Sequence, residues 1–292
     1  MNISVVYINT HRYDYESVCI CVASVRYWYP DMPIYLIKDL GQGNYDTAVL
    51  EEKWNVKIFV TTRKKFGWGY GKLEPLFLPQ KQSFLMLDSD TVLTGKIIDE
   101  ASIMEADFLV DEEVQPTNRF NEIYYNLTRI NELDKNFIYP GYSFNSGQWF
   151  GTSGLLTRED FEKFIEWSEP PTPKFPDIIF KGDQAVLNFV LHSKQQYQAL
   201  KIARKKIMIW PNHNNADFVD LQKIKQEDNA FPFVIHWAGM KQNKIKNYPR
   251  ADILLFYQNL YYSKLSSVEK LRDKFYLIWL TFEKWLKSVL NK

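Results

Sequence analysis

Short apolar segments alternate with helical patterns along the first third of the chain, and this alternation restricts the fold more than any other feature. Residues 15–29 carry an apolar stripe at helical spacing, and residues 71–79 form a shorter segment of the same kind. Strands separated by helices form βαβ units, so the sequence predicts an α/β fold with a mainly parallel central sheet. The segments predicted as strands are 3–8, 33–37, 56–61 and 83–88.

The later part of the chain has shorter predicted elements and no internal repeat. We expect one principal domain over residues 1–255, followed by a C-terminal amphipathic helical tail over residues 256–292. No GxGxxG motif follows the first strand, which disfavours a dinucleotide-binding domain. The elements predicted beyond residue 100 are strands at 106–111 and 148–156, helices at 158–168 and 183–192, and a proline-rich loop at 169–176.

Composition excludes several classes of protein. A chain of 292 residues with 46% hydrophobic and 24% charged residues is typical of a globular protein, and a net charge of +1 predicts no nucleic-acid partner. The two cysteines, Cys19 and Cys21, have a spacing that suits neither a disulfide framework nor a zinc site. With no signal-peptide pattern and no apolar run of membrane-spanning length, the sequence predicts residence in the cytoplasm.

Two aspartates, Asp88 and Asp90, directly follow the apolar run at 84–87. Open α/β sheets bind ligands where their strands end, so these carboxylates are candidate functional groups. Aspartate and serine also form turns by bonding to their own backbone. The same pattern opens phosphatases of the haloacid dehalogenase type, in which the first aspartate attacks phosphorus. Alternatively, the pair holds a divalent cation that binds a diphosphate. The motif alone leaves all three interpretations open.

Three later motifs favour one interpretation. Asn145 lies in the glycine-containing stretch 142–160, Asp183 and Gln184 begin a predicted helix, and His236 ends an apolar segment. In this order the motifs resemble those of the GT-A glycosyltransferases, most closely the glycogenin-like and lipopolysaccharide galactosyltransferase-like (family 8-like) enzymes. The resemblance covers about residues 3–245. It implies a GT-A fold, which is a Rossmann-like nucleotide-sugar-binding fold, and transfer of a sugar from a nucleoside diphosphate, most simply UDP, to a hydroxyl group.

The resemblance also implies roles for individual residues. Asp88, Asp90 and His236 would hold Mn²⁺ or Mg²⁺, whose preferred ligands include carboxylates and imidazole. Lys241, with Lys244 as an alternative, would neutralise the departing diphosphate. The nucleotide-sugar donor would be bound by Ile8, Thr10, Tyr15, Lys72, Asp88, Ser89 and Lys241.

Asn145, Asp183 and Gln184 are the residues expected beside the donor sugar, where an acidic or amide oxygen stabilises an oxocarbenium-like transition state. The pair Asp183–Gln184, here called the D-Q pair, resembles that of retaining enzymes. An inverting enzyme would instead use a carboxylate base at the acceptor. Asp183 also suits a helix cap. The alternatives to a transferase are a phosphatase that uses Asp88 and an inactive sugar-binding module on the same fold. The phosphatase is disfavoured because such enzymes carry their nucleophile on the first strand, near the start of the chain, whereas 87 residues precede Asp88.

The tail suggests a further partner. Residues 264–292 hold seven basic and three acidic residues, a net charge of +4. Phe275, Trp279, Phe282 and Leu286 recur at helical spacing beside these charges. A basic helix with an aromatic face predicts peripheral contact with an anionic membrane, here its inner face, and the alternative is packing against the domain or a partner subunit. We therefore expect a nucleotide-sugar donor, a glycan or glycolipid acceptor, and a role in surface glycan or lipopolysaccharide assembly.

Overall fold

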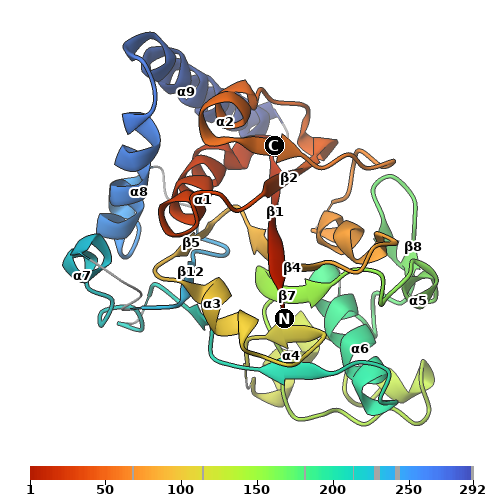
Figure 1. Cartoon of the computed structure of the whole chain (residues 1–292). Coiled ribbons are helices and arrows are strands. Elements are labelled where there is room, and N and C mark those ends of the chain that lie inside the picture. The colour runs from red at the N-terminus through yellow and green to blue at the C-terminus, as the bar shows by residue number, and fades with distance from the viewer. Residues whose placement is uncertain are drawn as a thin grey trace.

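A seven-stranded sheet forms the centre of the protein. The computed structural model describes residues 1–67, 69–113, 115–180, 182–212, 214–226, 231–240 and 244–290, without the side chains of residues 288 and 290. The strand order is β10-β6-β7-β4-β1-β2-β3, in which β7 runs antiparallel to β4 and β6 while the other neighbouring pairs are parallel (Figure 1). The strands are β1 (Ile3–His11), β2 (Ile34–Asp39), β3 (Val56–Ile58), β4 (Ser83–Asp88), β6 (Phe108–Val110), β7 (Gln148–Thr152) and β10 (Ile202–Arg204).

A smaller sheet stands beside the carboxyl end of β4. In it, β12 (Val234–His236) pairs in parallel with β11 (Met208–Ile209) and antiparallel with β5 (Thr91–Leu93). His236 is opposite Thr91 in this pairing, which brings the end of β12 next to the turn that follows β4. A hairpin of β8 (Ile165–Glu166) and β9 (Thr172–Pro173) forms a third, two-stranded sheet.

Helices cover both faces of the central sheet because successive side chains of a strand point in opposite directions. Val6 and Ile8 of β1 join one hydrophobic core, to which α1 and α8 contribute. Val5 and Tyr7 join the other, to which α6 contributes. The helices are α1 (Tyr15–Trp28), α2 (Ala48–Trp54), α3 (Ile97–Ser102), α4 (Thr117–Ile123), α5 (Glu159–Glu162), α6 (Asp183–Gln196), α7 (Leu221–Gln226), α8 (Ala251–Ser263) and α9 (Ser267–Leu290).

The α/β class with a mainly parallel sheet is confirmed, and some element bounds differ from the prediction. The helix predicted at 158–168 is wrong in its second half, because α5 ends at Glu162 and Ile165 pairs with Pro173 in the β8–β9 hairpin. Residues 70–77 form a 3-10 helix, in which Pro75 has no backbone N–H to donate. The strand predicted at 148–156 ends at Thr152, before a turn in which Gly154 has a φ of +71°.

The C-terminal helix α9 is fastened to the body of the protein by a buried carboxylate. Asp273 is 4% exposed and accepts hydrogen bonds from the hydroxyl groups of Tyr15 at 2.6 Å, Tyr262 at 3.0 Å and Tyr261 at 3.3 Å. The boundary predicted between residues 255 and 256 falls inside α8, and Tyr261, beyond that boundary, is buried in the main core. One face of the tail is therefore part of the core.

Replacement of Asp273 by alanine is expected to lower the free energy of unfolding by about 3 kcal/mol, because three buried or half-buried tyrosine hydroxyls lose a charged acceptor. Urea denaturation of the variant and of the parent measures this difference. Asp217→Ala, which removes an exposed carboxylate, is the control and should change stability by less than about 0.5 kcal/mol. Equal stability of Asp273→Ala and the parent would show that α9 is not held by these bonds.

Candidate active site

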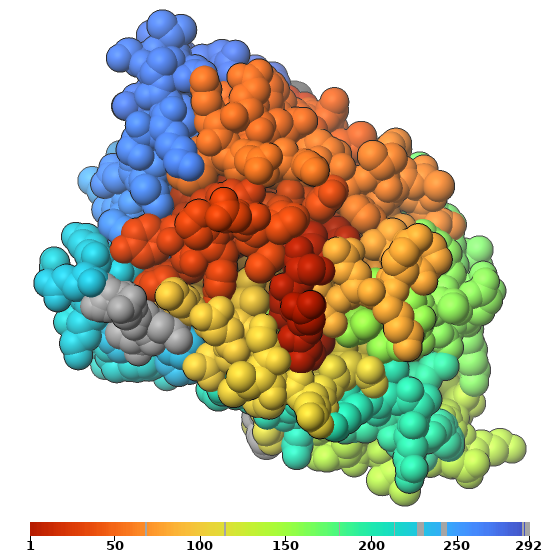
Figure 2. All heavy atoms as spheres, viewed as in Figure 1, coloured from red at the N-terminus to blue at the C-terminus, as the bar shows by residue number. Residues whose placement is uncertain are grey.

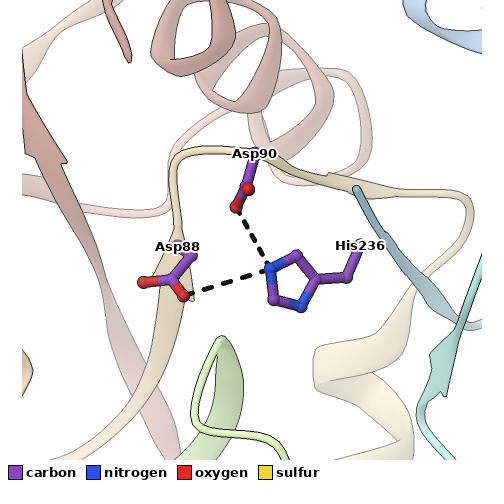
Figure 3. A group of neighbouring side chains, drawn as sticks. All are labelled: Asp88, Asp90 and His236. Atoms are coloured by element: carbon purple, nitrogen blue, oxygen red, sulfur yellow. Dashed lines mark hydrogen bonds and ion pairs between the residues drawn. The ribbon is translucent and has the colours of Figure 1, made fainter. Parts of the chain in front are cut away.

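Three potential metal ligands meet at the carboxyl end of β4. Asp88 is the last residue of β4, Asp90 lies in the turn that leads into β5, and His236 is the last residue of β12 (Figure 3). Because β5 and β12 are neighbours in the small sheet, their pairing places the histidine against the turn that holds Asp88 and Asp90, here called the D-x-D turn. The site is thus assembled where two sheets adjoin, from residues far apart in the sequence.

The geometry of this group suits a divalent cation. His236 Nε2 lies 3.1 Å from Asp90 Oδ1 and 4.0 Å from Asp88 Oδ2, and one ligand atom from each of the three residues lies within 4.8 Å of the others. The imidazole is 2% exposed, while the Asp88 and Asp90 side chains are 24% and 38% exposed, so the carboxylates are mostly buried and only partly open to solvent. Two carboxylates and one imidazole form a donor set that suits Mn²⁺ or Mg²⁺ and leaves room for ligands from solution.

The charges in this group depend on one another. Burial would raise the pKa of Asp90, but His236, a backbone hydrogen bond and Lys72 together outweigh burial, and the pKa lies below its ordinary value. Burial would lower the pKa of His236, and Asp90 reverses this so that the pKa is raised. Burial raises the pKa of Asp88, and the repulsion from Asp90 adds to the effect. The two carboxylates therefore favour a positive charge between them, whether on the imidazole or on a metal ion.

Two neighbours fix the orientation of His236, and the sequence did not reveal either of them. A Cβ atom on Gly147 would lie 2.1 Å from His236 Cε1, so the imidazole occupies the space that any other residue at position 147 would fill. The indole of Trp210 stacks on the imidazole, with 5.7 Å between ring centroids and an angle of 14°. A glycine at the beginning of a strand was the available signal, since such glycines often mark a close approach.

Lys72 joins the D-x-D turn to the D-Q pair. Its ammonium group lies 2.9 Å from Asp183 Oδ2 and 3.1 Å from both Asp88 Oδ1 and Ser146 Oγ, and its side chain is 5% exposed. Burial would lower the pKa of Lys72, but Asp183 and Asp88 outweigh it and raise the pKa. Lys72 is therefore a buried, charged residue beside Asp88, and its predicted contact with the donor stays a prediction.

Of the three residues predicted beside the donor sugar, one contacts Lys72, and the other two bond to the backbone of Ser146 and Gly147. Asp183 is the first residue of α6, and its carboxylate contacts Lys72. Gln184 Oε1 accepts a hydrogen bond of 3.1 Å from the backbone N–H of Ser146, and Asn145 Oδ1 accepts one of 2.7 Å from that of Gly147. Asn145 and Gln184 thereby shape the segment that approaches His236, and the roles of all three toward a sugar stay predictions.

Some of the residues predicted to bind the nucleotide lie next to the D-x-D turn, and others do not. Ile8 and Thr10 lie in β1, where the backbone of Asn9 is in register with Asp88, so their backbone is next to the D-x-D. Ser89 lies between the two aspartates and is 4% exposed. Tyr15 is also 4% exposed, and its hydroxyl binds Asp273, so its burial does not favour the predicted contact with the donor. Lys241 lies outside the described residues, and Lys244 is exposed.

Asp14 is a further acidic residue at the site that the sequence interpretation did not select. It lies in the short 3-10 helix Arg12–Asp14 after β1, its carboxylate is 3.0 Å from His11 Nε2, and Asp88, Ser89 and Asp90 are near enough to influence its pKa. Burial raises the pKa of Asp14 to about 6, although His11 opposes this. The signal was its position just beyond the end of β1, at the sheet edge where Asp88 also lies.

No protein-family model matches the chain, and no curated protein matches its sequence. Solved structures do match. The galactosyltransferase LgtC in complex with donor and acceptor sugar analogues is 14% identical, with a TM-score of 0.57 over 92% of this chain and 99% of that one. The bifunctional glycosyltransferase WbbM is 14% identical, with a TM-score of 0.55 over 88% of this chain and 50% of that one.

The glycosyltransferase GlyE of Streptococcus pneumoniae TIGR4, in its apo form, is 14% identical, with a TM-score of 0.52 over 99% of this chain and 64% of that one. This chain thus spans about half the length of WbbM and less than two thirds of that of GlyE. At such identities the likeness is one of fold. The fold is therefore that of the GT-A glycosyltransferases, as the sequence motifs predict.

Proposed function

We propose that this chain is a metal-dependent glycosyltransferase that moves a sugar from a nucleoside diphosphate, most simply UDP, to a hydroxyl group of an acceptor. The observation that carries the proposal is the cluster of Asp88, Asp90 and His236 at the carboxyl edge of a GT-A sheet. When bound there, Mn²⁺ or Mg²⁺ supplies positive charge to the diphosphate of the donor. Ser89 and the backbone of Ile8 and Thr10, which is next to Asp88, would bind the nucleoside.

Lys72 and Asp183 provide the charges around the reacting sugar. The fixed ammonium group of Lys72 holds both Asp88 and Asp183 in place, because it contacts each within 3.1 Å. A carboxylate at position 183 stabilises positive charge that develops on the anomeric carbon. The bond between that carbon and the phosphate oxygen breaks, a bond to the acceptor oxygen forms on the same face, and the leaving phosphate oxygen takes the acceptor proton. This retaining course rests on the resemblance of the D-Q pair.

The contacts of Asp88 support a transferase over a phosphatase. An aspartate that attacks phosphorus needs a free carboxylate oxygen aimed at the substrate. The Asp88 carboxylate is instead engaged by Lys72 and neighbours His236. The intact ligand cluster likewise supports an active enzyme over an inactive sugar-binding module. The acceptor we propose is a glycan or glycolipid, in surface glycan or lipopolysaccharide assembly.

The test is release of sugar from nucleotide sugars in the presence of manganese. We expect the purified chain to hydrolyse one UDP-sugar slowly without an acceptor, and nuclear magnetic resonance should show that the sugar first appears with the donor's anomeric configuration. Asp183→Asn should slow this release by at least about tenfold while UDP still binds, because the carboxylate acts on the sugar. Binding of UDP without any turnover of a full panel of donors would favour the inactive module. A covalent phosphate trapped on Asp88 would favour the phosphatase.

A further inference from the structure

The outward face of α9 carries a regular apolar stripe. Its members follow one another at alternating intervals of three and four residues, a spacing that keeps them on one side of a helix. Each side chain is between 50% and 78% exposed. We call the following residues the outer stripe: Val268, Leu271, Phe275, Ile278, Phe282, Trp285 and Val289. In the space-filling view the C-terminal helices stand out from the body at the upper left (Figure 2).

The opposite face of α9 holds the helix in place. Asp273 binds three tyrosine hydroxyls, Leu280 is 5% exposed, and Glu283 forms a 2.6 Å ion pair with Arg12. Arg12 also lies over the ring of Trp279, at 4.6 Å from its centroid. These contacts occur along most of the length of the helix. They fix its rotation about its own axis, so the outer stripe points away from the protein.

The charges of α9 are divided between its two faces. All three acidic residues of the helix are engaged with the body or with the inner face. Glu269 pairs with Lys53 at 3.2 Å, Asp273 is buried, and Glu283 binds Arg12. The exposed charges that accompany the outer stripe are basic, and they are Arg272 and Lys274, whereas Lys284 lies over the ring of Tyr13 on the body of the protein. The exposed side of α9 thus combines a broad apolar surface with positive charge.

We propose that the outer stripe docks on the headgroup boundary of an anionic lipid bilayer, with the helix lying in the plane of the membrane. Apolar side chains enter the boundary while the neighbouring cations meet the anionic headgroups. A second copy of the chain fits less well, because Arg272 and Lys274 would flank the stripe in both copies and repel each other. Among the described residues, no helix is long and apolar enough to cross a membrane. This inference does not depend on the proposed enzymatic activity.

Sedimentation of the full chain with lipid vesicles tests the proposal. We expect binding to vesicles that mix phosphatidylglycerol with phosphatidylcholine, weak binding to pure phosphatidylcholine, and weakening of the former as salt is added. The variant Ile278→Ser/Phe282→Ser should bind at least about tenfold more weakly, because it removes two apolar side chains from the contact. Ile138→Ser/Phe218→Ser is the matched control. Its side chains are 73% and 55% exposed, against 65% and 55% in the stripe, and it should bind within about twofold of the parent.

A second variant, Arg272→Glu/Lys274→Glu, alters only exposed charges, so it should fold and yet lose binding to the anionic vesicles. Retained binding in this variant, or equal binding of the parent to neutral and anionic vesicles, overturns the proposal. A dimer of the parent that Ile278→Ser/Phe282→Ser dissociates, without vesicle binding by either protein, would assign the stripe to a second copy instead. Binding of UDP with manganese, measured on the same samples, keeps this result separate from the proposed function.

Discussion

Replacement of Asp90 by alanine should nearly abolish manganese-dependent binding of UDP. The Asp90 carboxylate lies 3.1 Å from the imidazole of His236, and its loss leaves Asp88 and His236 as the only members of the cluster. Residues that merely support metal ligands typically contribute 10-fold to 100-fold to metal affinity, so we expect loss of a ligand to cost more than about 100-fold. Isothermal titration calorimetry with UDP, in manganese and in excess chelator, measures the effect.

Asp217→Ala serves as the control because it removes an exposed carboxylate of the same kind elsewhere on the surface. This control should keep the affinity of the parent for UDP. In chelator, the parent and Asp90→Ala should bind UDP equally weakly. If the parent binds UDP as tightly in chelator as in manganese, the cluster is not the site through which the nucleotide is held.

Replacement of Lys72 by methionine should destabilise the folded protein by about 3–5 kcal/mol, the cost expected when one partner of a buried ion pair is removed. Methionine fills a similar volume but leaves the carboxylates of Asp88 and Asp183 without the cation that both contact within 3.1 Å. Urea denaturation measures the loss in free energy of unfolding.

A second substitution distinguishes charge from packing in this result. In the double variant Lys72→Met/Asp183→Asn, one of the two uncompensated carboxylates is gone, so part of the stability lost in Lys72→Met should return. If the loss came from a packing defect, the double variant would stay as unstable as Lys72→Met. A loss below about 1 kcal/mol in Lys72→Met would mean that solvent already compensates these charges, and that Lys72 is not the link between the two motifs.

Much of the fold was predictable because alternating apolar segments determine both the strands and the faces that they bury. Asp88 and Asp90 were located by their place directly after such a segment, and His236 by the order of the motifs. The overlong helix at 158–168 arose because Phe161, Phe164 and Ile165 are all buried, as in a helix, although Ile165 belongs to a hairpin. The spacing of apolar residues in a short segment does not distinguish a buried helix from a short helix followed by a buried strand.

Contacts between distant segments were beyond the reach of the sequence. The close approach of Gly147 to His236 and the stacking of Trp210 depend on how the two sheets meet. The apolar face of α9 shows the same limit. Trp279 was expected on one face with Phe275 and Phe282, and it is 47% exposed, but its ring also lies against Arg12, while the outer stripe includes Ile278. Two apolar faces overlap in that helix. Which of them is buried depends on where the rest of the protein packs against α9.

The reversed direction of β7 leads the chain away from the candidate site. Since Gln148 pairs with Leu87 and Thr152 with Ser83, the strand starts beside Asp88 and ends at the opposite edge of the sheet. The chain then builds α5 and the β8–β9 hairpin before it returns to Asp183. Both ends of this excursion are anchored at the site, by Gly147 and by the contact of Asp183 with Lys72. A change of length between these two anchors would therefore leave Gly147 beside His236 and Asp183 beside Lys72.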